Sequence, residues 1–176
     1  MNKIQDYTLL ICLLVVFTSS ISFPVALEAQ STTEVLDRIA IADAVAKYSY
    51  TADARDLEGF LSLFTDDAVW KSYPAGSDEP ATVLDGREAI REFSLNLYQQ
   101  NAGIRTGHHQ SGLLFTALTG DTASTQNMIL LTRQAPGEDS PAVTVFGVYY
   151  DTWRKTPQGW RIATRTLRQQ PLAPVR

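Results

Sequence analysis

The hydrophobic pattern of this chain changes period after Asn101, and that change limits the folds open to it. Before Asn101, apolar residues recur every three or four positions, the spacing of helices that bury one face. After it, the pattern alternates as in β-strands, in segments separated by short turn sequences. The strand-like segments are 110–117, 123–134, 142–155 and 160–169. This order predicts an α+β domain with helices packed on one face of an antiparallel sheet.

The first part of the chain predicts three helices and one strand. The capping box at 31–34, Ser-Thr-Thr-Glu, predicts the start of a helix that runs to about Ala54. Its buried face is expected to carry Val35, Ile39, Ala42, Val45 and Ala46. Further helices are predicted over 57–64, capped by Asp56, and over 87–101. A strand is predicted over 68–73, followed by a loop at 74–80.

Composition fits one globular domain and argues against a nucleic-acid partner. The chain has 176 residues, of which 44% are hydrophobic and 19% charged, as in ordinary soluble proteins. The formal charge is −4, and the basic residues are scattered rather than grouped. A nucleic-acid-binding surface would need a concentrated basic patch. We therefore expect no nucleic-acid partner.

The first 29 residues resemble a signal peptide. Lys3 precedes the apolar run 9–17, and small or polar residues follow it. Cleavage is expected after Ala29, which predicts a secreted or periplasmic protein with no membrane attachment after cleavage. If the apolar reading is extended to Phe23, an uncleaved anchor is the alternative. After the leader, the chain is expected to form one domain over 31–170 and a tail over 171–176.

Cysteine chemistry is excluded from the mature domain. Cys12 is the only cysteine and lies inside the predicted leader. The two histidines, His108 and His109, are adjacent, so in a strand their side chains point to opposite faces. No acidic residue lies within a few positions of them to complete a ligand set. We therefore predict no metal site and no cofactor.

Several short motifs follow one another in a recognisable order. They are Tyr48 with Asp53 five residues later, Asp56, 63–68, 86–90, a histidine at the head of a strand, 120–123, 147–151 and 159–162. In this order the chain resembles the SnoaL-like group of the nuclear transport factor 2-like superfamily, over about 34–167. The resemblance implies a cone-shaped α+β barrel, with N-terminal helices packed on a strongly curved antiparallel sheet around a deep apolar pocket. It also implies a homodimer or homotrimer.

The resemblance also implies catalytic roles. Enzymes of this group include scytalone dehydratase, bile acid dehydratase, ketosteroid isomerase and polyketide cyclases. In the dehydratase-like members a helix Asp orients a sheet His, and a Tyr polarises a substrate carbonyl. Carried onto this chain, the Asp is Asp53, the Tyr is Tyr48, and the His is best matched by His109 because of its distance from Gly112. His108 is the less favoured match.

The remaining pocket residues match the group less well. Scytalone dehydratase has a second histidine on the neighbouring strand, where this chain offers Asn127, which binds but does not exchange protons. Arg165, near the end of the last strand, is expected either to bind a substrate oxyanion or to pair with a carboxylate. Substrate contacts are therefore predicted at Asn127, Arg165, Trp70, His108 and Tyr50. Trp70 also suits a role in the core or a subunit contact.

These residues predict proton-transfer chemistry on a small apolar, cyclic carbonyl compound. An imidazole titrates near 6.5 in unstructured peptides, which suits a base that removes a proton beside a carbonyl. A buried carboxylate would fix its tautomer, and a phenol would stabilise the enolate. The prediction is a cofactor-independent dehydratase, isomerase or cyclase. The alternative is a non-catalytic ligand-binding or dimerisation module, in which Tyr48, Asp53 and His109 are ordinary core, capping and strand residues.

Overall fold

The computed structural model describes residues 25–172. Most of the predicted leader and the last part of the predicted tail lie outside the described residues. No helix among the described residues is long and apolar enough to span a bilayer.

The described chain forms three helices and six strands, which confirms the α+β fold class. The elements are α1 (Val25–Ala54), α2 (Leu57–Leu61), β1 (Phe64–Tyr73), β2 (Thr82–Asp85), α3 (Arg87–Gln100), β3 (Arg105–Leu118), β4 (Thr122–Gln134), β5 (Ala142–Thr156) and β6 (Gly159–Gln169). The four predicted strands after Asn101 are all present. The short strand β2 was not predicted, because four residues after a loop carry too little pattern to identify them.

The sheet is open and mixed rather than closed and wholly antiparallel. Its strand order is β2-β1-β6-β5-β4-β3. Strands β3 to β6 form the predicted antiparallel meander, but β1 pairs with β6 in parallel, with Trp70 opposite Arg165. The parallel pair places the first and last of the described strands side by side, second and third in the strand order.

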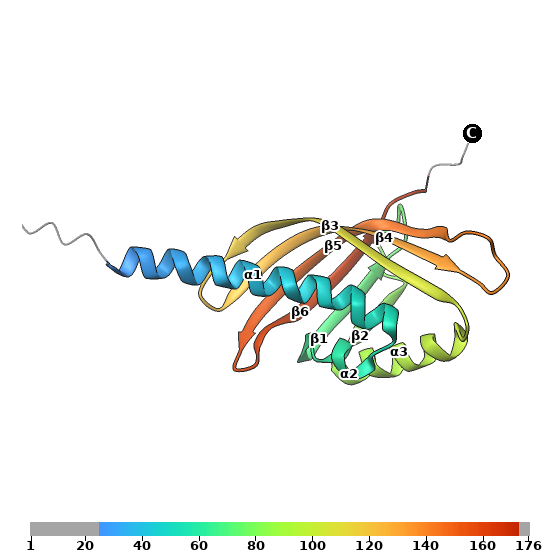
Figure 1. The fold of residues 1–176 in the computed structure, drawn as a ribbon, viewed down its shortest axis with the longest axis horizontal. Helices are drawn as coiled ribbons and strands as arrows, with labels where there is room; N and C mark the ends of the chain where they lie inside the picture. The colour runs from blue at the N-terminus through green and yellow to red at the C-terminus, as the bar shows by residue number, and fades with distance from the viewer. Residues whose placement is uncertain (1–24, 173–176) are drawn as a thin grey trace, which may run out of the picture.

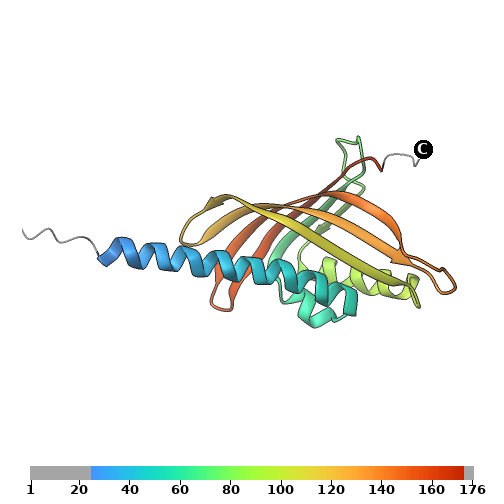
Figure 2. The ribbon, with the colours of Figure 1, turned by 45° about the horizontal axis from the view of Figure 1, so that its top comes forward.

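The helices cover one side of the curved sheet. The long helix α1 lies across it and packs mainly on β3 and β6, while α2 and α3 lie together at one end (Figures 1 and 2). Asp56 caps α2 as predicted, since its carboxylate accepts a hydrogen bond from the Gly59 backbone N–H at 3.0 Å. This arrangement brings the C-terminal end of α1 over the first residues of β3.

The first helix starts earlier than predicted. It begins at Val25 rather than at the capping box around Ser31. The upstream sequence Val-Ala-Leu-Glu-Ala-Gln is rich in good helix formers, so the helix extends through the Ser-Thr-Thr segment instead of starting there.

The buried face of α1 also differs from the prediction. Val35 and Ile39 are 55% and 52% exposed, and Ala42 and Ala46 are exposed as well. Val45 is buried as predicted, and the other residues of the buried face are Asp37, Ile41, Ala44, Tyr48 and Thr51. A carboxylate is buried at its start because Asp37 accepts a hydrogen bond from the Trp160 indole N–H at 2.8 Å and pairs with Lys155. Because Asp37 is charged, hydrophobic spacing alone could not identify it as part of the buried face of α1.

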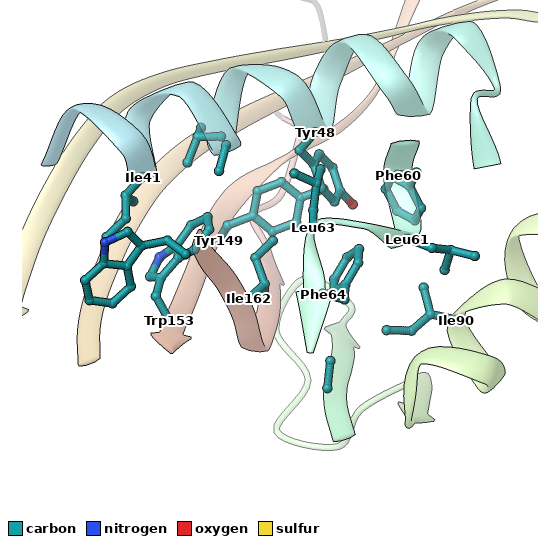
Figure 3. Packing of buried hydrophobic residues seen from close by; sticks show 14 of the residues in the cluster. Ile41, Tyr48, Phe60, Leu61, Leu63, Phe64, Ile90, Tyr149, Trp153 and Ile162 are labelled. Carbon is teal, nitrogen blue, oxygen red and sulfur yellow. The ribbon is translucent and has the colours of Figure 1, made fainter. Parts of the chain in front are cut away.

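The core is aromatic where the helices meet the sheet. Tyr48, Phe60 and Phe64 form a cluster of tilted and edge-on rings, with Tyr149 beside Tyr48 (Figure 3). Ile41, Ile162 and Trp153 continue the core toward the N-terminal part of α1 (Figure 3). Edge-on ring contacts contribute stabilisation beyond area burial alone.

Candidate active site

The last turn of α1 positions Asp53. Helix α1 ends where Arg55 takes a left-handed backbone conformation, with φ 57°. The Arg55 guanidinium then donates a hydrogen bond to the Ile104 carbonyl at 3.0 Å and a longer one to the Tyr98 carbonyl. These contacts tie the helix end to the segment that leads into β3. Asp53 is thereby held against the first residues of that strand.

His108, and not His109, meets Asp53. The His108 Nδ1 lies 2.6 Å from the Asp53 Oδ1, and the His108 backbone N–H donates to Oδ2 at 2.9 Å. His109 is exposed, and its Nε2 lies 3.1 Å from the Thr132 hydroxyl. The pairing of Asp53 with His109 was therefore wrong, and the less favoured histidine takes the position.

The strand register explains this choice. On β3, the alternate residues Thr106, His108 and Gln110 all reach toward α1: the first two contact Asp53, and Gln110 donates to the Ser49 hydroxyl at 2.8 Å. Counting from Gly112 fails because Gly112 has φ 65° and lies in a break of the β3–β4 register between Ser111 and Leu114.

Asp53 stays ionised more readily than an ordinary aspartate. Partial burial by itself would raise its pKa. The hydrogen bonds from the His108 ring and backbone N–H, together with the Thr106 hydroxyl, outweigh that effect, so the pKa of Asp53 is lowered from 3.8. An ionised Asp53 at Nδ1 favours the tautomer in which Nδ1 carries the proton, which leaves Nε2 free to accept one.

Tyr48 lies beside the pair on α1. Its ring meets the His108 ring edge-on, with centroids 5.8 Å apart, and only 4% of Tyr48 is exposed. Tyr149 on β5 packs against the other side of Tyr48. Burial raises the pKa of the Tyr149 phenol well above 10, and a hydrogen bond with Tyr48 adds to this. The structure thus brings Tyr48 and Asp53 together with His108 in place of the predicted His109, and it adds Tyr149.

Arg165 forms a buried ion pair, the second of the two alternatives predicted for it. Its Nε and Nη2 donate to the two oxygens of Asp151 at 2.8 and 2.7 Å, and neither side chain is exposed. The guanidinium carbon lies 4.0 Å from the Tyr48 ring centroid and 4.2 Å from that of Tyr149. Arg165 therefore packs against both tyrosine rings, and it does not line the cavity.

A cavity of about 410 Å³ lies on one side of the pair. Each of the nine helices and strands contributes to its wall, which is mostly apolar. The lining includes Trp70, for which a substrate contact remains a prediction, together with Tyr48, Phe60, His108, Ile129 and Tyr149. The volume suits one small organic ligand.

Asn127 and Tyr50 lie away from this cavity. They line a separate outer groove between α1 and β3, which also reaches Asp53, His108 and His109. Asn127 is buried and donates to the Gln110 side-chain oxygen at 2.7 Å, and Tyr50 is 78% exposed. Neither residue lines the apolar cavity, so their predicted ligand contacts would have to be made in the outer groove. No cluster of three potential metal ligands occurs among residues 25–172.

Several cavity residues escaped the sequence analysis. Thr106 could have been predicted from strand alternation, since it lies two residues before His108 and therefore on the same face of the strand. Tyr149 lies in the motif 147–151, but that motif did not assign it to the site, and Arg55 and Arg133 gave no local motif that separates them from surface residues. They enter the site only through the packing of distant elements.

The fold and site together define an α+β domain in which helices cover a curved sheet around an apolar cavity, with His108 of the His108–Asp53 pair in the cavity wall. The family model described as SnoaL-like domain matches residues 33–166. The chain therefore belongs to the SnoaL-like family.

Similar proteins agree with this assignment. An uncharacterized protein of Mycobacterium tuberculosis is 29% identical over 137 residues, which is 77% of this chain and 86% of that protein. The structure is similar to an NTF2-like protein with a cystatin-like fold from Novosphingobium aromaticivorans, with TM-score 0.70, 20% identity, and coverage of 87% of this chain and 94% of the other. A candidate scytalone dehydratase of the same organism gives TM-score 0.67 at 21% identity, covering 83% and 92%. These structural similarities establish the fold alone.

Proposed function

We propose that this protein is a cofactor-independent dehydratase, isomerase or cyclase acting on a small apolar, cyclic carbonyl compound. The observation that carries the proposal is the 2.6 Å contact between the His108 Nδ1 and Asp53, with His108 in the wall of an apolar cavity. A histidine oriented by an ionised carboxylate is equipped to act as a general base. Family membership supports the reaction class, since the fold is also shared by a candidate scytalone dehydratase.

The proposed steps are proton transfers that the side chains of the site can perform. The His108 Nε2 removes a proton from the carbon beside the substrate carbonyl. The Tyr48 hydroxyl donates a hydrogen bond to the carbonyl oxygen, where negative charge develops. The imidazolium, stabilised by Asp53, then returns the proton to a departing hydroxyl to give water, or to another carbon to give an isomer.

The adjacent histidines provide a matched test. A ligand is first isolated by incubating the purified protein with a metabolite extract, and its conversion is followed by mass spectrometry and NMR. His108→Ala is expected to lower turnover by about 10²- to 10⁴-fold, the usual contribution of a general base. His109→Ala removes the same group on the opposite face and should change turnover less than about twofold.

Two results would contradict the mechanism. Full turnover by His108→Ala would exclude His108 as the base. An equal loss in both variants would point to general damage to β3, which circular dichroism and thermal unfolding of the variants would reveal. Asp53→Asn should slow turnover while leaving ligand affinity within a few-fold, since Asp53 contacts His108 and lies outside the cavity lining.

One observation favours the binding-module alternative. On β4 and β5 the cavity lining includes Ile129, Leu131 and Val145, so the pair faces apolar side chains there and no second histidine or carboxylate. A ligand recovered unchanged after long incubation, with affinity insensitive to His108→Ala, would establish binding without catalysis.

A further inference from the structure

The charged residues of the cavity are all of one sign. Its lining includes Arg55 and Arg133 and no aspartate or glutamate, although the whole chain carries a formal charge of −4. An apolar cavity whose lining carries positive but no negative side chains favours anions. A ligand that was wholly apolar would gain nothing from this arrangement.

The two arginines are not equally free. The Arg55 guanidinium is engaged with the backbone carbonyls of Tyr98, Asn101 and Ile104, and lies over the Tyr98 ring. The Arg133 backbone pairs with its neighbours in the sheet, but its side chain has no hydrogen bond or ion pair with any residue of the part of the chain that the structure describes. Its N–H donors are therefore available to a ligand, while Arg55 fixes the neighbouring segment and adds its charge.

The position of Arg133 relative to the His–Asp pair is set by the strand register. Arg133 on β4 lies opposite Thr106 on β3, and His108 follows Thr106 by two residues on the same face. Two residues of a strand span about 7 Å. A group held by Arg133 would thus lie about one ring length from a carbon placed at His108.

We propose that the cavity binds a cyclic apolar compound bearing a single carboxylate, with that carboxylate held by Arg133 and the ring extending toward His108 and Trp70. Arg and carboxylate match in charge and in bidentate geometry. The inference rests on the proposed function, because both assign the same cavity, but it concerns binding and does not require turnover.

A pair of fluorescent probes tests the proposal. Anilinonaphthalene sulfonate carries one negative charge, and N-phenylnaphthylamine is the same ring system without it. Both brighten in apolar cavities, so titration of the full chain gives both dissociation constants. Arg133→Gln should weaken the anionic probe by about tenfold, the scale of one charge-assisted contact, and leave the neutral probe within about twofold.

Arg105→Gln is the matched control. Arg105 lies next to Thr106 on β3, is exposed, and is absent from the cavity lining, yet the change removes the same unit of charge. It should leave both probes within about twofold. The proposal is overturned if Arg133→Gln affects neither probe, if it weakens both equally, or if Arg105→Gln has the same effect as Arg133→Gln.

This outcome is separable from that of the proposed function. His108→Ala should keep the preference for the anionic probe, since it leaves Arg133 in place. A lost preference in Arg133→Gln with no enzymatic turnover in any assay would support the anion site and refute catalysis. Intact turnover in a parent protein that shows no preference for the anionic probe would support catalysis and refute the anion site.

Discussion

Arg165 shows how one buried residue can organise a site without touching its ligand. Its charge is matched by Asp151, and its flat guanidinium packs against both Tyr48 and Tyr149 at distances typical of cation–π contacts. The buried ion pair therefore fixes two phenol rings that line the cavity. Removal of the carboxylate would leave an unpaired charge in the core, which is far more costly than loss of a surface pair.

Asp151→Asn is accordingly expected to lower the free energy of unfolding by about 3–5 kcal/mol. The control is Asp66→Asn, because Asp66 pairs with Arg87 while 86% of its side chain is exposed. That change should cost less than about 1 kcal/mol. Urea unfolding of the two variants and the parent measures both. Equal costs would contradict a structural role for the buried pair.

For single residues, the sequence could identify members of the site but not which of them are in contact. Tyr48 and Asp53 lie in a recognisable order and do meet a histidine. Which histidine they meet depends on whether even or odd positions of β3 face α1. That parity is set by the pairing of β3 with β4 and by the break near Gly112, and neither can be derived from β3 alone.

At the scale of elements, α1 carries two apolar stripes, of which its own sheet buries only one. Val35 and Ile39 lie on the exposed stripe, and Ile41 and Val45 lie on the buried one. Both stripes have helical spacing, so periodicity alone could not choose between them. The packing of Asp37 against Trp160 and Lys155 decides the rotation of the helix, and this ion pair joins residues more than a hundred positions apart.

The two isoleucines test this rotation directly. Ile41 is fully buried and Ile39 is 52% exposed. Ile41→Ala should lower the free energy of unfolding by about 2–5 kcal/mol through loss of apolar burial and the cavity left behind. Ile39→Ala should change it by less than about 0.5 kcal/mol. Thermal unfolding compares them, and a larger loss at Ile39 would mean that α1 packs by its other face.

At the scale of the whole molecule, the strand meander follows from alternation and turns, whereas the cavity does not. Its wall draws on all nine elements, and Arg133 and Tyr149 join it because β4 and β5 lie next to each other in the curved sheet. The parallel pairing of β1 with β6 also joins segments from opposite ends of the domain. Such contacts depend on the complete topology, so they cannot be predicted from local patterns in the sequence.

The stability of the whole fold should fall as the solution becomes acidic. Burial alone would raise the pKa of Asp37, but the hydrogen bonds from Lys155 and Trp160 outweigh it, so its pKa is lowered from 3.8; that of Asp53 is lowered as well. Groups with a lowered pKa bind fewer protons in the folded than in the unfolded chain. Their contribution is therefore fully present well above 3.8 and is lost as pH falls through the lowered values.

The melting temperature should thus change little from these two groups between about pH 7 and 5 and fall steeply between about pH 5 and 3. Asp37→Asn supplies the control, because an amide cannot titrate. That variant should be less stable at neutral pH and lose less of its remaining stability on acidification than the parent. Parallel melting curves for parent and variant across this range would show that Asp37 contributes no pH-dependent stability, and the paired carboxylate would then not be what holds α1 in its observed rotation.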